Sequence, residues 1–533
     1  MDMKYSVFSE NEWVYPDSTL GGAVSAALDT PRGGDVCLQL LTDTVLGGGE
    51  ELAVKGCGLP KGVTLTAYRL LPVNVAENSG PKLFCTKNYD EVKDFVTRQA
   101  PFEVYDITES LSGKTRAGRL ALWLRLDAAA DALPGAYDFR ISVKAGENSL
   151  SLPVSLTVHA AKVPPLADAK FGMVNWVYCD PVAADHGVEA GSDDFFRILR
   201  EYFANQTDMR NTHFMIPAGK PVRDVEGKVV DFDFTLAEAV AREALDAGLN
   251  YVMGGFTARF KEWNDPDMYL LWDREVGVTG IEGFRQLKLY YTRAWESVCR
   301  MGIADRYYQC LVDEPQFPNS LAYRAMSGIC RSCMPGVKIH DPVETTDIGG
   351  ALDVWVVKQA VYEKHIENFR ALQSFGEEMW LYTCGFPAGR TMNRCHDLPL
   401  TVSRLTMWMC ILYRCTGFLH WGYHRHSTKP GEAPEACYSI SGGRMYPPGN
   451  SYVVYPAPFV PGSSGYEVAY GVRGHLQRTG AQDAELLMQL GEAEADELIK
   501  KVCTSFNDYT GDAALFDRVR RELLIAVSNK AAK

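Results

Sequence analysis

From residue 171 onward the sequence alternates short apolar segments with helix-length segments, and this alternation restricts the fold more than any other feature. Several of the helix-length segments end in glycine, as helix C-caps commonly do. Eight strands alternating with helices predict a (β/α)8 barrel of the TIM type with insertions. The predicted strands are residues 171–178, 211–217, 250–256, 306–315, 336–342, 352–358, 378–385 and 416–423.

The first 165 residues have a different pattern. Segments such as "GRLALWLRLDAA" and "AYDFRISVKAG" alternate apolar and polar residues with a period of two, between clusters of turn-forming residues. This pattern predicts an antiparallel β-sandwich domain over residues 1–165. The linker-like stretch "AAKVPPLADAK" then leads into a second domain, predicted over residues 166–533. That domain would hold the barrel and C-terminal helices, with "LQRTGAQDAELL" in the eighth barrel helix.

Charge and composition exclude some partners. A net charge of −13 argues against a nucleic-acid or anionic-membrane partner, because both require a basic surface. The chain has no apolar run long enough for a transmembrane helix and no signal-peptide core, so we expect a cytoplasmic location unless a leader was removed. Cys330 and Cys333 lack a second pair at ligand spacing, so we predict no metal and no cofactor. The oligomeric state is not predicted.

Polar residues collect at the predicted strand ends, and in a barrel the C-terminal strand ends form the active site. Asp313 and Glu314 end strand four in "YYQCLVDEP". Other residues at strand ends are Asn175, Trp176, His213, His340, Asp341, Glu344, Lys358, Tyr382, His420 and Trp421. Carboxylates, aromatics and hydrogen-bonding groups around one opening predict a glycan or glycoconjugate substrate. In the alternative interpretation, Asp313 caps the next helix and Glu314 is simply solvated.

The mechanism depends on which carboxylates are present. An ordinary retaining glycosidase uses an acid and a separate carboxylate nucleophile about 5–5.5 Å apart. Strand seven ends "MWLYTCGFP" and strand eight reads "FLHWGYHRH", and neither contains a carboxylate. Substrate assistance needs no enzymic nucleophile, because the 2-acetamido oxygen of the sugar attacks the anomeric carbon. Asp313 and Glu314 could then orient the acetamide and protonate the leaving oxygen, and their mutual repulsion would raise one pKa.

The segment "DRYYQCLVDEP" resembles the strand-four region of glycoside hydrolase family 123, the β-N-acetylgalactosaminidase group. The resemblance continues through "PGVKIHDP", "LDVWVVK", "MWLYTCGFPAGRTMNR", "SRLTMWMCILYRCTGFLHWGY" and "LQRTGAQDAELL", over most of residues 170–500. It implies a retaining exo-glycosidase for terminal β-linked N-acetylgalactosamine. In that mechanism Asp313 would orient the acetamide and stabilise the oxazolinium intermediate. Glu314 would serve as general acid and then general base.

We also predict substrate contacts from Tyr382, Trp421, His340, Asn393 and Trp176. Structural roles compete with these predictions: Tyr382 and Trp421 could belong to the barrel core. His340 could be a hydrogen-bonded structural histidine, and Asn393 could order the loop after strand seven.

Two other functions remain open. A glycosidase for a sugar without a 2-acetamido group would use Glu314 with another carboxylate, such as Asp341 or Glu344. A non-catalytic glycan-binding protein would keep the barrel and its aromatic residues. The adjacent acids argue against the latter, because binding alone does not require them.

Overall fold

The computed structural model describes residues 2–111, 115–460, 462–463 and 465–531. The chain divides into two compact units. Unit 1 comprises Met1–Ala169, Cys384–Tyr413 and Gly422–Lys533, and unit 2 comprises Lys170–Thr383 and Arg414–Trp421. This division differs from the two consecutive domains that we predicted at 1–165 and 166–533. Most of the C-terminal segment groups with the N-terminal residues.

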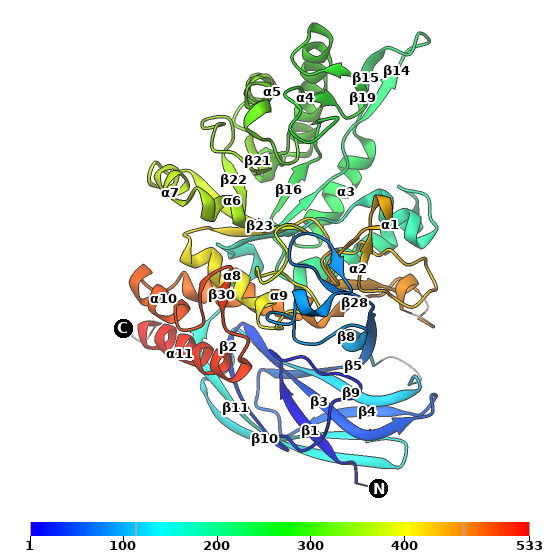
Figure 1. Cartoon of the computed structure of the whole chain (residues 1–533), viewed down its shortest axis with the longest axis vertical. Helices are drawn as coiled ribbons and strands as arrows, with labels where there is room; N and C mark the ends of the chain where they lie inside the picture. Colours follow the sequence, from blue (N-terminus) through cyan, green and yellow to red (C-terminus); the bar gives the residue numbers. More distant parts are fainter. Residues whose placement is uncertain (1, 112–114, 461, 464, 532–533) are drawn as a thin grey trace. The chain divides into compact units, whose positions relative to one another are not determined.

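Unit 2 is built on an eight-stranded sheet in the order β12-β24-β23-β22-β21-β20-β16-β13 (Figure 1). All of its neighbouring strands run parallel. Seven of these strands lie within their predicted segments and β21 extends one residue beyond its own, so the barrel prediction is confirmed. The strands are β12 (Gly172–Asn175), β13 (His213–Met215), β16 (Tyr251–Gly254), β20 (Tyr307–Gln309), β21 (Lys338–Val343), β22 (Val354–Lys358), β23 (Glu378–Thr383) and β24 (Gly417–His420).

The two edge strands of this sheet, β12 and β13, form no regular ladder of backbone hydrogen bonds, but individual hydrogen bonds connect the segments that contain them. The backbone N–H of Thr212 donates to the Met173 carbonyl at 2.8 Å, and the Met173 N–H donates to Thr212 Oγ1 at 2.9 Å. The Asn175 N–H donates to Asn211 Oδ1 at 2.9 Å. These bonds satisfy backbone groups that would otherwise be left at open edges. The sheet is therefore a nearly closed barrel.

The interior of the barrel is filled by aromatic side chains. Trp380 occupies space left by two glycines, because a Cβ atom at Gly172 or Gly417 would come within 1.9 or 2.3 Å of its ring. His340 and His213 pack against Trp380 with ring-centroid distances of 4.8 and 5.0 Å. The barrel centre is thus a packed core, and a substrate site must lie at the strand ends.

Helices and two insertions connect the strands. Helix α4 shows why these segments are helical: Leu287, Tyr291, Ala294 and Val298 recur at helical spacing and are buried. The helices of unit 2 are α1 (Cys179–His186), α2 (Asp193–Asp208), α3 (Thr235–Asp246), α4 (Ile281–Met301), α5 (Ser320–Cys333), α6 (Gln359–Lys364) and α7 (Ile366–Ser374). The insertions are the hairpin β14 (Lys220–Arg223) and β15 (Val229–Asp233), and the sheet of β17 (Ala258–Arg259), β18 (Tyr269–Leu270) and β19 (Asp273–Gly277).

Unit 1 contains the predicted N-terminal sandwich (Figure 1). One sheet, in the order β1-β3-β9-β5-β8-β28-β27, comprises β1 (Tyr5–Ser9), β3 (Gly34–Leu46), β5 (Val63–Val75), β8 (Phe102–Ser110), β9 (Gly118–Ala128), β27 (Val454–Pro456) and β28 (Val468–Gly471). The other, β2-β11-β10-β4, comprises β2 (Ala26–Arg32), β4 (Leu52–Cys57), β10 (Gly135–Ala145) and β11 (Asn148–Lys162). Alternate side chains such as Leu38, Leu122, Ile141 and Val154 form a shared core between the sheets.

The C-terminal segment completes this unit. On the outer face of the larger sheet, Cys37, Leu41 and Trp123 pack with Val472 and Leu476 of helix α9 (Val472–Leu487). Strand β3 therefore buries both of its faces. We predicted α9 as the eighth barrel helix, whereas the structure assigns it to unit 1. The other long helices of this unit are α8 (Val402–Leu412), α10 (Glu492–Ile499) and α11 (Ala513–Ala531).

Buried ion pairs hold these helices in unit 1. Arg473 Nη2 lies 2.8 Å from Asp106 Oδ2, and Arg404 Nε lies 2.6 Å from Asp483 Oδ2, with all four side chains buried. His396 Nε2 also lies 2.9 Å from Asp106, and the arginine and histidine hold the pKa of Asp106 far below its usual value despite its burial. Each charge is compensated, as burial requires.

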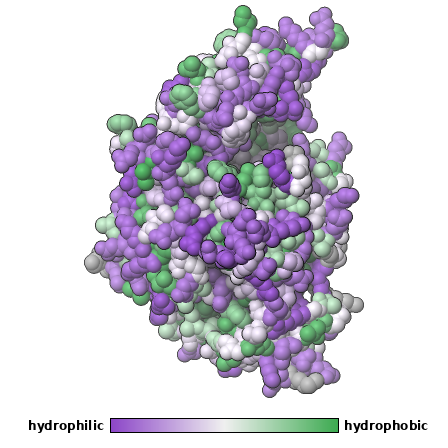
Figure 2. All heavy atoms as spheres, viewed as in Figure 1, coloured by the Kyte–Doolittle hydropathy of each residue, from purple (hydrophilic) through white to green (hydrophobic). Residues whose placement is uncertain are grey.

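The visible surface in Figure 2 is mostly hydrophilic, with hydrophobic residues scattered among the polar ones. Among the described residues, no helix combines the length and the apolar character needed to cross a membrane.

Candidate active site

The acid pair lies in a segment that leaves strand β20 soon after the strand ends at Gln309. Neighbouring strands hold this segment by unusual bonds. The Leu311 carbonyl accepts from the Thr257 N–H at 2.9 Å, beyond the end of β16. On the other side, the Leu311 N–H lies 3.0 Å from both carboxylate oxygens of Asp341 in β21. The segment is thus fixed between two strands although it is no longer part of the parallel ladder.

Glu314 has a left-handed backbone conformation, with φ of 53°. This conformation costs a non-glycine residue about 1–2 kcal/mol, so the surroundings must enforce it. Two backbone bonds do so: the Glu314 N–H donates to the Pro342 carbonyl, and the Glu344 N–H donates to the Pro315 carbonyl, both at 3.2 Å. Adjacent residues of a strand point to opposite faces, and the left-handed residue removes that alternation for Asp313 and Glu314.

Asp313 does not cap the next helix. The turn that precedes α5 is closed by Asn319, whose Oδ1 accepts a hydrogen bond from the Gln316 N–H at 2.8 Å. Asn319 is also the residue that immediately precedes the helix. The helix-capping interpretation of Asp313 is therefore wrong, and its carboxylate is left for another role.

One lysine connects the charged groups of the site. Lys358 Nζ, at the end of β22, lies 3.0 Å from Glu314 Oε1 and also forms an ion pair with Glu344. The Tyr382 hydroxyl, on β23, donates to the same oxygen of Glu314. Lys358 is 6% exposed, whereas each of the two glutamates is 16% exposed. Glu314 therefore has two donors, and two carboxylates share one ammonium group.

Asp313 is open to solvent, yet protein atoms surround its carboxylate on most sides. Loss of hydration and the neighbouring Glu314 carboxylate raise the pKa of Asp313, and the Lys358 cation opposes this change. Asp313 therefore holds a proton more tightly than an isolated aspartate does.

Three of the predicted substrate contacts lie at strand ends of unit 2. Tyr382 contacts the acid pair directly. Trp176 follows β12 and is buried with its ring 5.5 Å from that of Phe256, and its indole N–H has no partner among the described residues. Trp421 follows β24, is half-buried and stacks on His420 at 6.1 Å.

The other two predicted contacts have different surroundings. His340 is fully buried in the barrel interior, 4.8 Å from Trp380 between ring centroids. Asn393 belongs to unit 1, where its Nδ2 donates to the Cys384 carbonyl at 2.7 Å and its Oδ1 accepts from Asn450 at 3.1 Å. Because packing or protein hydrogen bonds already account for both side chains, neither enters the site proposed below.

Lys358 and Glu344 lie next to Glu314 but were not among the predicted substrate contacts. Both were recognisable as strand-end residues, and Glu344 was one of two possible carboxylate partners of Glu314, but nothing in the sequence placed Lys358 beside both glutamates. Asp341, the other possible carboxylate partner of Glu314, is fully buried. It accepts hydrogen bonds from the Leu311 N–H and, at 2.8 Å, from the Tyr323 hydroxyl. Burial raises the pKa of Asp341 well above its usual value. Its role is to hold the segment that carries the acid pair.

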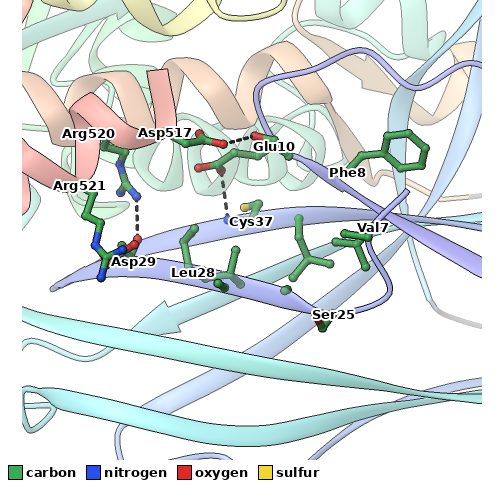
Figure 3. Close-up of a pocket in the computed structure, with 16 residues that line it drawn as sticks. Val7, Phe8, Glu10, Ser25, Leu28, Asp29, Cys37, Asp517, Arg520 and Arg521 are labelled. Atoms are coloured by element: carbon green, nitrogen blue, oxygen red, sulfur yellow. Dashed lines mark hydrogen bonds and ion pairs between the residues drawn. The ribbon is translucent and has the colours of Figure 1, made fainter. Parts of the chain in front are cut away.

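Unit 1 has a separate cavity of about 230 Å³, lined by residues of β1, β2, β3 and α11 (Figure 3). Its charged groups are bonded to the protein. Glu10 accepts from the Cys37 N–H at 3.1 Å, and Arg520 donates to the Asp29 carbonyl at 2.8 Å. Asp517 accepts from the Ser9 hydroxyl at 2.8 Å. These groups link α11 to the sheet, so this cavity is not our candidate for the active site.

Comparison with known proteins assigns part of the chain to a family. Residues 256–490 match the family model described as "Glycoside hydrolase 123, catalytic domain". The chain carries a family 123 catalytic domain. The matched segment contains Asp313, Glu314, Glu344, Lys358 and Tyr382. The family resemblance seen in the sequence is confirmed, and the protein is a glycoside hydrolase.

A solved structure shares this fold. A family 123 glycoside hydrolase from Clostridium perfringens, studied for glycolipid glycan hydrolysis, is 13% identical, with a TM-score of 0.74. The alignment covers 100% of this chain and 98% of that one. A β-D-glucuronidase from Dictyoglomus thermophilum is 9% identical over 90% of this chain and 68% of its own, but its TM-score of 0.36 is too low to carry an argument. A search of curated proteins gives no match.

Proposed function

We propose that this family 123 domain is a retaining exo-glycosidase that releases terminal β-linked N-acetylgalactosamine by substrate assistance. The observation that carries the proposal is the turn holding Asp313 and Glu314. A left-handed residue removes the strand alternation there, and Lys358 acts electrostatically on both carboxylates. A mechanism that uses two neighbouring carboxyl groups on one sugar requires such a turn.

In the proposed reaction, Glu314 protonates the leaving glycosidic oxygen while the acetamido oxygen attacks the anomeric carbon. Asp313 accepts a hydrogen bond from the acetamide N–H and stabilises the positive charge of the oxazolinium intermediate. Glu314 then removes a proton from water, which opens the intermediate with overall retention. Lys358 and Tyr382 stabilise the Glu314 carboxylate that exists between these two steps.

The resting charge state supports this division of roles. The raised pKa of Asp313 favours a proton on that carboxyl group in the resting enzyme. A hydrogen bond from the acetamide N–H favours the ionised form of Asp313. The proton then passes to Glu314, where the leaving oxygen needs it. Binding of a substrate with a 2-acetamido group would thereby place the proton on Glu314, as cleavage of that substrate requires.

We infer that Trp176, Trp421 and Tyr382 surround the sugar that is cleaved. Each lies at the C-terminal end of a different barrel strand, and the unpartnered indole N–H of Trp176 is a donor that a sugar oxygen could satisfy. The Clostridium perfringens enzyme is described as hydrolysing glycolipid glycans. We extend this to a glycoconjugate substrate for the present protein.

A second candidate is a glycosidase for sugars without a 2-acetamido group, with Glu344 as nucleophile and Glu314 as acid. The specific observation that favours it is the ammonium group of Lys358, which both glutamates share. Asp341 cannot take the place of Glu344, because it is enclosed and hydrogen-bonded to the backbone. The two candidates therefore differ in the residue that assists Glu314.

A panel of p-nitrophenyl glycosides separates the candidates. We expect the wild type to cleave the β-N-acetylgalactosaminide, with inhibition by a thiazoline analogue of the oxazolinium intermediate. Asp313→Asn and Glu314→Gln should each lose most of this activity, while Glu344→Gln should retain part of it. Activity confined to sugars without the acetamide, and abolished by Glu344→Gln, would establish the second candidate. Glycan binding without any turnover would contradict both.

A further inference from the structure

Trp263 is a large apolar side chain exposed in the loop between β17 and β18, with 55% of its surface accessible. A single exposed aromatic residue is ordinary on a protein surface. The position of Trp263 is unusual, because Lys358 Nζ lies 5.9 Å from its ring centroid. Since the same nitrogen is 3.0 Å from Glu314 Oε1, the ring centre lies within about 9 Å of the proposed acid.

The loop that carries Trp263 is attached to the segment of the acid pair on both sides. Before Trp263, Ala258 forms a bridge with Val312. After it, the Asp265 carbonyl accepts a hydrogen bond from Asn319 Nδ2 at 3.1 Å. These contacts set the position of the exposed ring relative to Asp313 and Glu314.

We propose that Trp263 forms a subsite for the leaving group, where the first sugar beyond the scissile bond stacks on the indole ring. This inference rests on the proposed role of Glu314, which delivers its proton to the oxygen between the two sugars. A group within 9 Å of that acid contacts either the cleaved sugar or the residue attached to it. The exposure of Trp263 favours the attached residue, because the rest of a glycoconjugate must extend into solvent.

The chemistry of the ring fits a sugar ligand. The apolar C–H face of a pyranose can cover an aromatic face, and burial of that face is favourable. Phe260 contacts Trp263 edge-on at 5.9 Å, so the pair offers an extended aromatic surface. Lys358 Nζ lies over the ring, 5.9 Å from its centroid, and is a hydrogen-bond donor close to where a stacked sugar would lie. The expected ligand is therefore a neutral sugar linked to the cleaved residue.

The test compares Trp263→Ala with wild type on two substrates, a β-N-acetylgalactosaminyl-galactose disaccharide and methyl β-N-acetylgalactosaminide. We expect kcat/KM for the disaccharide to fall about tenfold or more, as for loss of a buried aromatic contact, and the methyl glycoside to change less than about threefold. Trp263→Phe should recover most of the loss. Phe375→Ala, at an aromatic residue that is 81% exposed after α7, is the matched control and should change neither substrate.

Equal losses on both substrates, or no loss on either, would overturn the subsite. Failure of the proposed function gives a different result. If the wild type cleaves another sugar, the methyl and disaccharide forms of that sugar provide the same comparison. If the wild type cleaves no glycoside, binding of the disaccharide to wild type and to Trp263→Ala is compared by calorimetric titration. Equal affinities of the two proteins would reject the proposed subsite.

Discussion

Replacement of Lys358 by methionine should move the pH profile of the enzyme to higher pH. Methionine preserves most of the buried stem and removes only the charge that Glu314 and Glu344 share. A nearby cation favours ionised carboxylates and so lowers the pKa of Asp313. Without the cation the pKa of Asp313 rises further, so the acids keep their proton to a higher pH. The alkaline limb of the activity profile therefore moves to higher pH. The acid limb moves in the same direction.

The size of the shift follows from the ion pair. At 3.0 Å, two unit charges interact by roughly 5 kcal/mol in a medium with an effective dielectric constant near 20. Glu344 uses part of the same charge, and the glutamates are partly accessible to water, so we expect about 1–3 kcal/mol to act on the acid pair. This corresponds to a shift of about 1–2 pH units.

The assay is kcat/KM as a function of pH, on the glycoside that the wild type cleaves fastest. Lys358→Arg keeps the charge and should leave the limbs within about half a unit, since the opposing cation is retained. Lys364→Met removes an exposed lysine of α6 and is the matched control. Thermal unfolding of each variant checks that the fold is intact. Unchanged limbs in a folded, active Lys358→Met enzyme would refute the electrostatic role of Lys358.

Three further predictions concern single contacts. Tyr382→Phe removes a hydroxyl that donates to Glu314 and should lower kcat/KM about tenfold or more, with little change in urea stability. Asp341→Leu leaves buried donors without their acceptor and should lower the free energy of unfolding by about 2–4 kcal/mol, read from the urea midpoint. Arg473→Met leaves Asp106 charged and uncompensated in unit 1 and should cost about 3–5 kcal/mol by the same measurement.

Each of these three has an outcome that would contradict it. For Tyr382→Phe, wild-type kinetics would show that the hydroxyl does not act on the acid. An Asp341→Leu variant as stable as the wild type would mean that the segment after β20 does not depend on that carboxylate. For Arg473→Met, the double variant with Asp106→Asn is the control: it should regain part of the lost stability, and no recovery would reject the uncompensated-charge explanation.

The sequence by itself determined the eight barrel strands and the position of Asp313 and Glu314 at the end of the fourth. Both are consequences of local pattern. Apolar runs of strand length between amphipathic helices allow few folds, and the C-terminal strand ends of a barrel share one side. The family resemblance also came from contiguous segments. For the same reason, the sequence could propose Tyr382, which directly follows buried strand residues, as part of the site.

Only the tertiary structure decided which neighbours these residues have. The cluster of Lys358, Glu344 and Glu314 joins the ends of three strands, and the direction of each side chain depends on strand register. His340 shows this dependence: it lies in β21 near Asp341, yet its register turns it into the barrel core. The C-terminal segment, likewise, joins the sandwich because β28 pairs with β8 and α9 covers a face of the same sheet. Burial of apolar surface between distant segments selects such pairings, and no local pattern encodes them.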